Sequence, residues 1–195
     1  MAAIANGRSV ESTMGFSTLG GLLMGTRCGD IDPGLLLYLL NEGIVDLPGA
    51  QALLYEKSGL LGVSGISGDI RDLLGRQRPA AARDAVALFC YSAQKHLAAL
   101  TAVLGGLDRI VFTGGIGENS AEVRQRICAG LAYLGVDLDP DRNERHEQTI
   151  SFPDSPVAMH VIPADEEMII ARHTYRLAVS RGTQTPGKPQ PTPHK

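Results

Sequence analysis

The ten residues from 111 to 120 constrain the fold more than any other stretch of this chain. Their sequence, VFTGGIGENS, places three glycines shortly after the apolar run 110–112, which is typical of a buried strand. We expect a helix to begin at Asn119 or Ser120, with Glu122 three residues after Asn119 in a capping box. A strand, a glycine turn and a helix N-terminus leave free main-chain N–H groups for an anion. The segment therefore predicts a phosphate cradle and indicates a nucleotide ligand.

Other interpretations of this segment stay open at this point. An ordinary tight turn between a strand and a helix has the same residue types and binds nothing. A Walker A loop is excluded because no Lys-Ser or Lys-Thr follows the glycines. A dinucleotide-binding dehydrogenase domain is disfavoured, because Ser120 stands in the place of the third glycine of G-x-G-x-x-G and the repeated βαβ pattern is missing.

Composition and charge exclude several classes of protein. The length of 195 residues is enough for one domain with a substantial core. A formal net charge of −3 gives no basic surface for nucleic acid, and the longest apolar run, residues 35–40, is too short to span a membrane. Cys28, Cys90 and Cys128 are widely spaced, which predicts free thiols and no zinc site. We therefore expect a cytoplasmic protein without nucleic-acid or membrane partners.

The rest of the chain predicts helices separated by a few strands, which indicates an α/β fold. Asn6-Gly7 predicts a tight hairpin between residues 2–5 and 8–12. We expect a Gly/Ser-rich loop over 60–68 and a second strand over 157–162, and residues 182–195 have the composition of a disordered tail. The expected helices cover residues 33–41, 48–57, 69–75, 79–104, 119–133 and 165–180.

Six blocks of sequence resemble the acetate kinase family. They are RSVESTMGF (8–16), MGTRCGDIDP (24–33), SGLLGVSG (58–65), DIRDL (69–73), the segment 111–120 and IPADEEM (162–168). The similarity runs from Met1 to about Val179, and the order and spacing of the blocks make it specific. It implies an actin-like, ribonuclease-H-like kinase fold, in which residues 1–181 form the C-terminal, nucleotide-binding domain of an acyl kinase.

The resemblance also implies an activity and a set of site residues. The activity is the ATP-dependent phosphorylation of acetate, or of another short carboxylate, with Mg²⁺. Arg27 corresponds to the family's catalytic arginine, and a guanidinium suits the charge that spreads over a transferring phosphoryl group. Glu166 corresponds to a glutamate that takes part in magnesium binding. The implied ATP-binding residues are Asp69, Ile70 and Arg71 at the adenosine, and Gly115, Ile116, Gly117, Glu118 and Asn119 in the glycine-rich segment.

Each of these residues also has an ordinary structural interpretation. Arg27 fits a surface loop, and Asp69 fits the N-cap of a short helix with Arg71 on its solvated face. Acidic residues around Glu166 complement the dipole of a helix that begins behind Asp165. The histidines lack partners at metal-ligand spacing, and the family's catalytic histidines belong to segments before Met1, so none is assigned here.

Parts of the family pattern are absent from this chain. The His-Leu-Gly-Asn-Gly phosphate loop and the N-terminal domain, which carries further active-site residues, are not in the sequence. We therefore expect a truncated first sheet strand, an exposed sheet edge, and an isolated chain without turnover. An N-terminal acetate kinase domain and, in the intact family, a homodimer are the expected protein partners. The alternative hypothesis is a non-catalytic nucleotide-binding fragment or a gene remnant.

Overall fold

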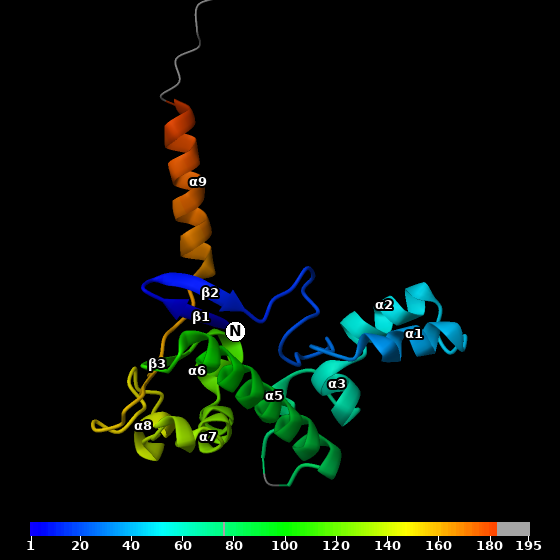
Figure 1. The fold of residues 1–195 in the computed structure, drawn as a ribbon, viewed down its shortest axis with the longest axis horizontal. Coiled ribbons are helices and arrows are strands. Elements are labelled where there is room, and N and C mark those ends of the chain that lie inside the picture. Colours follow the sequence, from blue (N-terminus) through cyan, green and yellow to red (C-terminus); the bar gives the residue numbers. More distant parts are fainter. Residues whose placement is uncertain (76, 183–195) are drawn as a thin grey trace, which may run out of the picture. The chain divides into compact units, whose positions relative to one another are not determined.

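The computed structural model describes residues 1–75 and 77–182, which form two separate units. Unit 1 covers Met1–Ile162 and has mixed α/β structure, and unit 2 begins at Pro163 and is described by helix α9 (Glu166–Gly182). Figure 1 draws both units as a ribbon. No helix in the described part of the chain combines the length and the apolar character needed to cross a membrane. The predicted tail falls on residues 183–195, outside the described residues.

Unit 1 contains short helices around one long helix, α5 (Ala80–Leu104). The predicted ends of α5, at Pro79 and at Gly105, are confirmed, and Gly105 has the left-handed conformation common after a helix. The side chains of Asp32 and Asp46 cap α1 and α2 by accepting from the N–H groups of Gly34 and Gly49. The other helices are α1 (Pro33–Asn41), α2 (Leu47–Glu56), α3 (Gly59–Ser64), α4 (Ile70–Leu73), α6 (Gly114–Asn119), α7 (Ala121–Ala129), the 3-10 helix η1 (Ala132–Leu134) and α8 (Pro140–Glu144).

The N-terminal hairpin is confirmed. Strands β1 (Ala2–Ala5) and β2 (Arg8–Ser12) pair antiparallel, with a register shift between Ala3 and Ile4. Asn6 and Gly7 have φ of 51° and 74°, the positive values that a type I′ turn requires at both of its central residues. All residues of β2 are exposed.

A second two-stranded sheet leads into the glycine-rich segment. Strands β3 (Arg109–Phe112) and β4 (Ala158–Val161) pair in parallel, with Phe112 opposite Val161. Helices α6, α7 and α8 lie between them in the sequence, as a crossover connection requires. Ile110 and Phe112 are buried but Val111 is 46% exposed, so the predicted buried strand is buried on one face only. The resulting alternation is the period of two that a half-buried strand shows.

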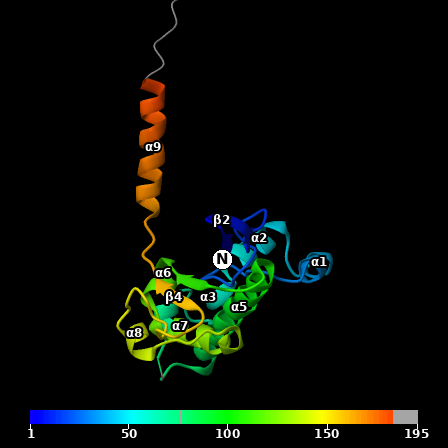
Figure 2. The same ribbon diagram turned by 60° about the vertical axis from the view of Figure 1, so that its left-hand side comes forward.

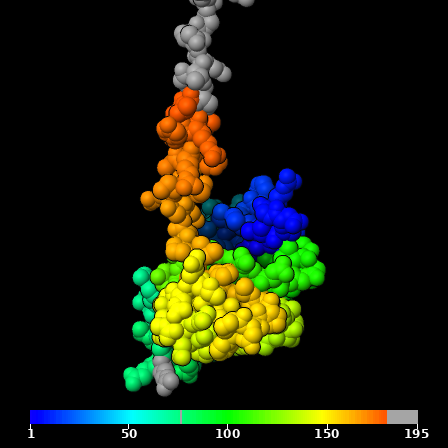
Figure 3. Space-filling view, turned by 90° about the vertical axis from the view of Figure 1, so that its left-hand side faces the viewer, coloured from blue at the N-terminus to red at the C-terminus, as the bar shows by residue number. Residues whose placement is uncertain are grey.

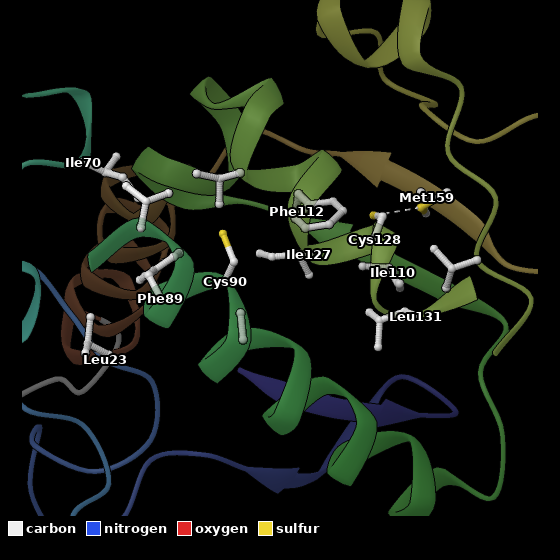
Figure 4. Close-up of a cluster of buried hydrophobic side chains, with 14 of the residues drawn as sticks. Leu23, Ile70, Phe89, Cys90, Ile110, Phe112, Ile127, Cys128, Leu131 and Met159 are labelled. Atoms are coloured by element: carbon white, nitrogen blue, oxygen red, sulfur yellow. Dashed lines mark hydrogen bonds between the residues drawn. The ribbon is translucent and has the colours of Figure 1, made fainter. Parts of the chain in front are cut away.

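The core of unit 1 lies along α5. This helix contacts the β1–β2 hairpin, α3, α4 and α7, and Figure 4 shows Phe89 and Cys90 of α5 in the same buried cluster as residues of β3 and α7. Figures 1 and 2 both place α1 and α2 at the end of unit 1 away from α7 and α8, and Figure 3 shows the segment after α7 on an outer face. The most buried members of the core are Leu60, Leu73, Ala82, Ala85, Val86, Ala93, Val123, Leu131, Ile150, Val157 and Met159.

All three cysteines are free, as predicted. Cys90 and Cys128 belong to the core, and burial raises the pKa of Cys90 to about 11 and that of Cys128 to about 12. Because the reactive form of cysteine is the thiolate, these two side chains act as small apolar groups and not as nucleophiles.

Two predicted elements were wrong in detail. The predicted loop over 60–68 is helical in its first half, because α3 begins at Gly59 and buries Leu60 completely. The predicted single helix over 119–133 is divided, since α7 ends at Ala129 and the 3-10 turn η1 follows, with Gly135 in left-handed conformation. In both cases tertiary packing overrides the local composition.

Candidate nucleotide site

The glycine-rich segment forms the short helix α6 and not the open turn that the sequence suggested. Gly114 has φ of +73°, a value that favours glycine, and its N–H donates to Oε1 of Glu118 at 2.6 Å. Nδ2 of Asn119 donates back to the carbonyl oxygen of Gly115 at 2.9 Å. A methyl group added to Gly114 or Gly115 would meet no atom within 4 Å, so open space lies beside both residues. A ligand can therefore approach the main chain closely at the start of α6.

The helix after this segment is capped at Ser120, one of the two positions predicted for its start. Ser120 is the N-cap of α7, and its Oγ accepts from the N–H of Val123 at 3.3 Å. Because Asn119 is the last residue of α6, the capping box with Glu122 predicted for it is wrong. Glu122 instead forms an ion pair with Arg126 one turn later on α7.

Asp69 and Arg71 form an exposed ion pair at the start of α4. Asp69 is the N-cap, and its Oδ1 accepts from the main-chain N–H of Arg71 at 2.9 Å and from Nε of the same residue at 3.0 Å. This side-chain hydrogen bond lowers the pKa of Asp69 to about 2 and raises that of Arg71. The side chain of Arg71 is 83% exposed, so its planar group is open to a ligand. Ile70 is 4% exposed and belongs to the core, where it anchors α4 and is not an exposed apolar surface.

Arg27 lies on a tight turn that α2 and α3 hold in place. The N–H groups of Leu60 and Leu61, at the start of α3, donate to the carbonyl oxygens of Met24 and Gly25 at 2.9 Å. Oγ1 of Thr26 donates to the carbonyl oxygen of Tyr55 in α2, also at 2.9 Å. Arg27 is half-buried, and its Nη1 lies 3.5 Å from the carbonyl oxygen of Thr18. The main chain beside Arg27 is therefore fixed from two helices.

The Arg27 turn touches the segment that leads to Asp69, main chain against main chain. A methyl group added to Gly25 would lie 2.7 Å from the carbonyl oxygen of Gly68, and one added to Gly68 would lie 3.0 Å from that of Gly25. Only glycines permit an approach this close. The structure thus brings the main chain two residues before Arg27 against the main chain just before Asp69, although the two segments lie in separate sequence blocks.

The third segment, α6, is connected to these two through the core. Phe112, two residues before α6, and Ile70, the first residue of α4, belong to the same buried cluster (Figure 4). Gly117 packs on Phe112, since a methyl group there would lie 3.4 Å from its carbonyl carbon. Arg27, Asp69, Arg71 and the start of α6 thus all belong to unit 1.

Glu166 belongs to unit 2 and is described within that unit alone. It is the first residue of α9, where Oδ1 of Asp165 accepts from the N–H of Met168 at 2.9 Å, so Asp165 provides the cap. Within residues 1–75 and 77–182, no three or more His, Cys, Asp or Glu side chains gather as a metal site. A single exposed carboxylate still fits Mg²⁺, which usually keeps water and nucleotide phosphates as most of its ligands.

Sequence reasoning missed a buried arginine behind α6. Arg124 of α7 is 0% exposed, and it contacts α6 together with Asn143 of α8 and His146. One signal could have found it, because Arg124 follows Val123 directly and precedes Ile127 by three residues, inside the apolar stripe of α7. A second unforeseen contact joins Nε2 of His96 to Asp30, 3.6 Å apart.

Comparisons with known proteins agree on one family. The acetokinase family profile matches residues 1–172. An acetate kinase of Rhodopseudomonas palustris (strain TIE-1) is 52% identical over 180 residues, which cover 91% of this chain and 45% of the relative. The acetate kinase structure from Entamoeba histolytica has a TM-score of 0.85 at 36% identity, covering 90% of this chain and 48% of that one. A propionate kinase structure from Francisella tularensis has a TM-score of 0.83 at 35% identity, covering 88% and 44% respectively.

Proposed function

The chain belongs to the acetokinase family, with the actin-like, ribonuclease-H-like fold of its solved relatives, and we propose that it provides the ATP-binding half of an acyl kinase. One observation carries the proposal most directly, namely the main-chain contact between Gly25 and Gly68. It joins the turn that carries Arg27 to the segment that leads into Asp69 and Arg71, which supports placing a charge-stabilising arginine and a nucleotide contact in one site. The family match covers both segments and α6 as well.

In this proposal the nucleotide lies over the start of α6 and the surface of α4. The phosphates approach Gly114 and Gly115, where open space gives access to the main chain and the helix start favours an anion. Ile116, Gly117, Glu118 and Asn119 complete this short helix. At the other end, the Arg71 guanidinium offers a plane for the base and Asp69 accepts from a ribose hydroxyl, while Ile70 anchors α4.

Arg27 acts on the reaction itself in this proposal. A carboxylate oxygen of the substrate attacks the γ-phosphorus, a new O–P bond forms, and the bond to the ADP oxygen breaks. The guanidinium of Arg27 stabilises the charge that develops on the transferring group. By the family correspondence, Glu166 is proposed as a carboxylate ligand of Mg²⁺, a cation that usually keeps water and phosphates as most of its ligands and would supply further charge neutralisation.

The substrate and the protein partners are proposed on the same basis. Relatives include both acetate and propionate kinases, so we propose acetate or another short carboxylate as the acceptor. The chain spans less than half the length of the curated relatives it matches. We therefore propose that an N-terminal acetate kinase domain completes the cleft, that the completed enzyme is a homodimer, and that this chain alone has no turnover.

The first test is a calorimetric titration of the chain with Mg-ATP. We expect saturable binding, and a dissociation constant raised about tenfold by Arg71→Ala, since a tenfold change corresponds to ~1.4 kcal/mol, the scale of one exposed stacking contact. Arg145→Ala is the matched control, because Arg145 also pairs with an acid two residues away, Glu147, on the surface. Binding unaffected by Arg71→Ala would contradict the placement of the base.

A second test addresses turnover. The chain is mixed with the N-terminal portion of the Rhodopseudomonas relative, and acyl phosphate formed from acetate and Mg-ATP is measured as hydroxamate. We expect acyl phosphate only in the mixture, and we expect Arg27→Ala to abolish it. A chain that is folded by circular dichroism and binds no Mg-ATP would instead be a gene remnant, and one that binds without ever supporting turnover would be a nucleotide-binding fragment.

A further inference from the structure

Arg124 is the only arginine among the described residues that is completely buried, and its guanidinium contacts α6, α8 and His146. Nε donates to Oδ1 of Asn143 at 2.7 Å. Nη1 donates to the carbonyl oxygens of Gly117 and Glu118 at 2.9 and 2.8 Å. Nη2 donates to the carbonyl oxygen of Asn143 at 2.9 Å and lies 3.2 Å from Nδ1 of His146. A guanidinium has five N–H donors; four of them have oxygen acceptors here, and Nδ1 of His146 lies beside the fifth.

The two carbonyl groups that Nη1 contacts belong to the last turn of α6. A helix leaves its final carbonyl oxygens without intrahelical partners, and a helix of this length is not stable alone. The first turn of α6 is held by the side chain of Glu118, which accepts from Gly114. The last turn is held by Arg124. The conformation of the glycine-rich segment is thus imposed by side chains at both of its ends.

The same guanidinium connects α6 to α8. Asn143 is 2% exposed, and its Nδ2 donates to the carbonyl oxygen of Ala121, at the start of α7. Nδ1 of His146 also lies 3.1 Å from the carbonyl oxygen of Glu118. An apolar side chain in place of Arg124 would avoid the cost of burying a charge. It would, however, leave the carbonyl oxygens of Gly117 and Asn143 without these donors. The role of the arginine is therefore to bind main-chain carbonyl groups.

We propose that Arg124 is the positioning residue of the phosphate-binding segment. By fixing the carbonyl groups of Gly117 and Glu118, it holds α6 in the conformation that leaves the main chain at Gly114 and Gly115 open to the nucleotide phosphates. Arg124 is buried behind α6 and touches no ligand itself. The inference rests on the proposed function, because it assumes that Mg-ATP binds at α6.

The test compares Arg124→Lys with Arg126→Lys. Both positions lie on α7, but Arg126 is exposed and pairs only with Glu122 in the described chain. Lysine keeps the positive charge but lacks the planar guanidinium group, so it cannot bind the carbonyl oxygens of α6 and α8 at the same time. For Arg124→Lys we expect a lower melting temperature and, at a temperature where circular dichroism shows it folded, an Mg-ATP dissociation constant raised about tenfold, or ~1.4 kcal/mol. For Arg126→Lys we expect the affinity of the unmodified chain.

The possible outcomes separate this inference from the proposed function. If folded Arg124→Lys melts lower but binds Mg-ATP as tightly as the unmodified chain, Arg124 is merely structural and the inference is overturned. If the unmodified chain binds no Mg-ATP, the proposed function fails and the inference fails with it.

A second measurement decides the question if Arg124→Lys does not fold. Hydrogen exchange of the unmodified chain is compared with and without Mg-ATP. We expect slower exchange both in α6 and at Asn143 and His146, in and after α8, because these two residues contact Arg124 or α6 directly. Protection confined to α6 would overturn the inference.

Discussion

The Arg27 turn and helix α6 are both irregular, glycine-rich parts of the proposed site, yet they are held in opposite ways. The Arg27 turn is fixed by main-chain contacts with Gly59 and Gly68, where no side chain fits. Helix α6 is fixed by the side chains of Glu118 and Arg124, while open space lies beside its first glycines. The first region therefore depends on the absence of side chains at Gly59 and Gly68, alongside one side-chain hydrogen bond from Thr26, and the second depends on the presence of Glu118 and Arg124.

Glycine therefore has a different role in each of the two regions. In the Arg27 turn, glycines allow the main chain to approach itself, so a substitution changes the fold. In α6, Gly115 leaves room for something outside the chain, so a substitution there is expected to change binding and not folding. The two regions are expected to respond differently to the same mutation, glycine to alanine.

The largest expected effect is on stability, at Gly59. Alanine there would lie 2.8 Å from the carbonyl oxygen of Arg27 and closer still to that of Met24, at a φ of +64°. We expect the free energy of unfolding to fall by about 4 kcal/mol, from the left-handed strain and the displacement of the turn together. Urea denaturation followed by circular dichroism measures it.

Gly65→Ala is the matched control for this prediction. Gly65 ends α3 with the same φ of +64°, but an added methyl group would meet no atom within 4 Å. We expect a loss of about 1 kcal/mol, from the left-handed conformation alone. Equal losses for the two variants would show that the close approach at Gly59 contributes nothing.

The second prediction concerns affinity, at Gly115 in α6. Because alanine is the better helix former and open space surrounds this residue, Gly115→Ala should leave the free energy of unfolding unchanged or raise it by up to about 1 kcal/mol. The methyl group would occupy the approach to the main chain. We therefore expect the Mg-ATP dissociation constant to rise about tenfold, or ~1.4 kcal/mol, in calorimetry.

Gly15→Ala provides the comparison for Gly115→Ala. Gly15 also has open space beside it, but it lies outside α6. We expect no change in affinity there. Unchanged binding in Gly115→Ala would place the phosphates elsewhere on the molecule.

Local signals in the sequence were sufficient for much of the fold. Asn6-Gly7 predicts the hairpin, and Asp32 and Asp69 predict the starts of α1 and α4, because turns and caps depend on neighbouring residues. Helix α3 was missed because it is stabilised by contacts with residues far away in the sequence. The Gly/Ser composition of 60–68 is typical of a loop, whereas burial of Leu60 and its hydrogen bond to Met24 favour a helix.

In the candidate site, too, local sequence indicated the single segments but not the contacts between residues far apart in the chain. The resemblance indicated Arg27, the Asp69–Arg71 pair and α6 as separate segments, and their roles remain predictions. The Gly25–Gly68 contact and the Arg124 network were not predictable, because each joins residues far apart in the chain. Asn143 lies 19 residues after Arg124, and no local pattern indicates that α8 returns to meet α7.

The smallest predicted effect belongs to Asp69, which is held by an exposed ion pair and not by close main-chain packing or a buried side chain. Its pKa is held at about 2 in the folded chain, against an ordinary value of 3.8, first by the side-chain hydrogen bond from Arg71. A carboxyl group whose pKa is lower in the folded state stabilises the fold above its unfolded pKa. That contribution is therefore complete above about pH 4 and disappears as the pH falls toward about 2.

Asp69→Asn isolates this contribution, because asparagine still caps α4 but carries no charge. We expect the melting temperature of the variant to lie slightly below that of the unmodified chain near neutral pH, and the difference to vanish as the pH approaches about 2. Because Arg71 causes the shift, the same comparison in an Arg71→Ala background should show a smaller difference. A difference that persists at the lowest pH would mean that the cap, and not the ion pair, gives Asp69 its role. In that case the Arg71–Asp69 ion pair would not stabilise the fold, and Arg71 could contact the base of the nucleotide without a loss of stability.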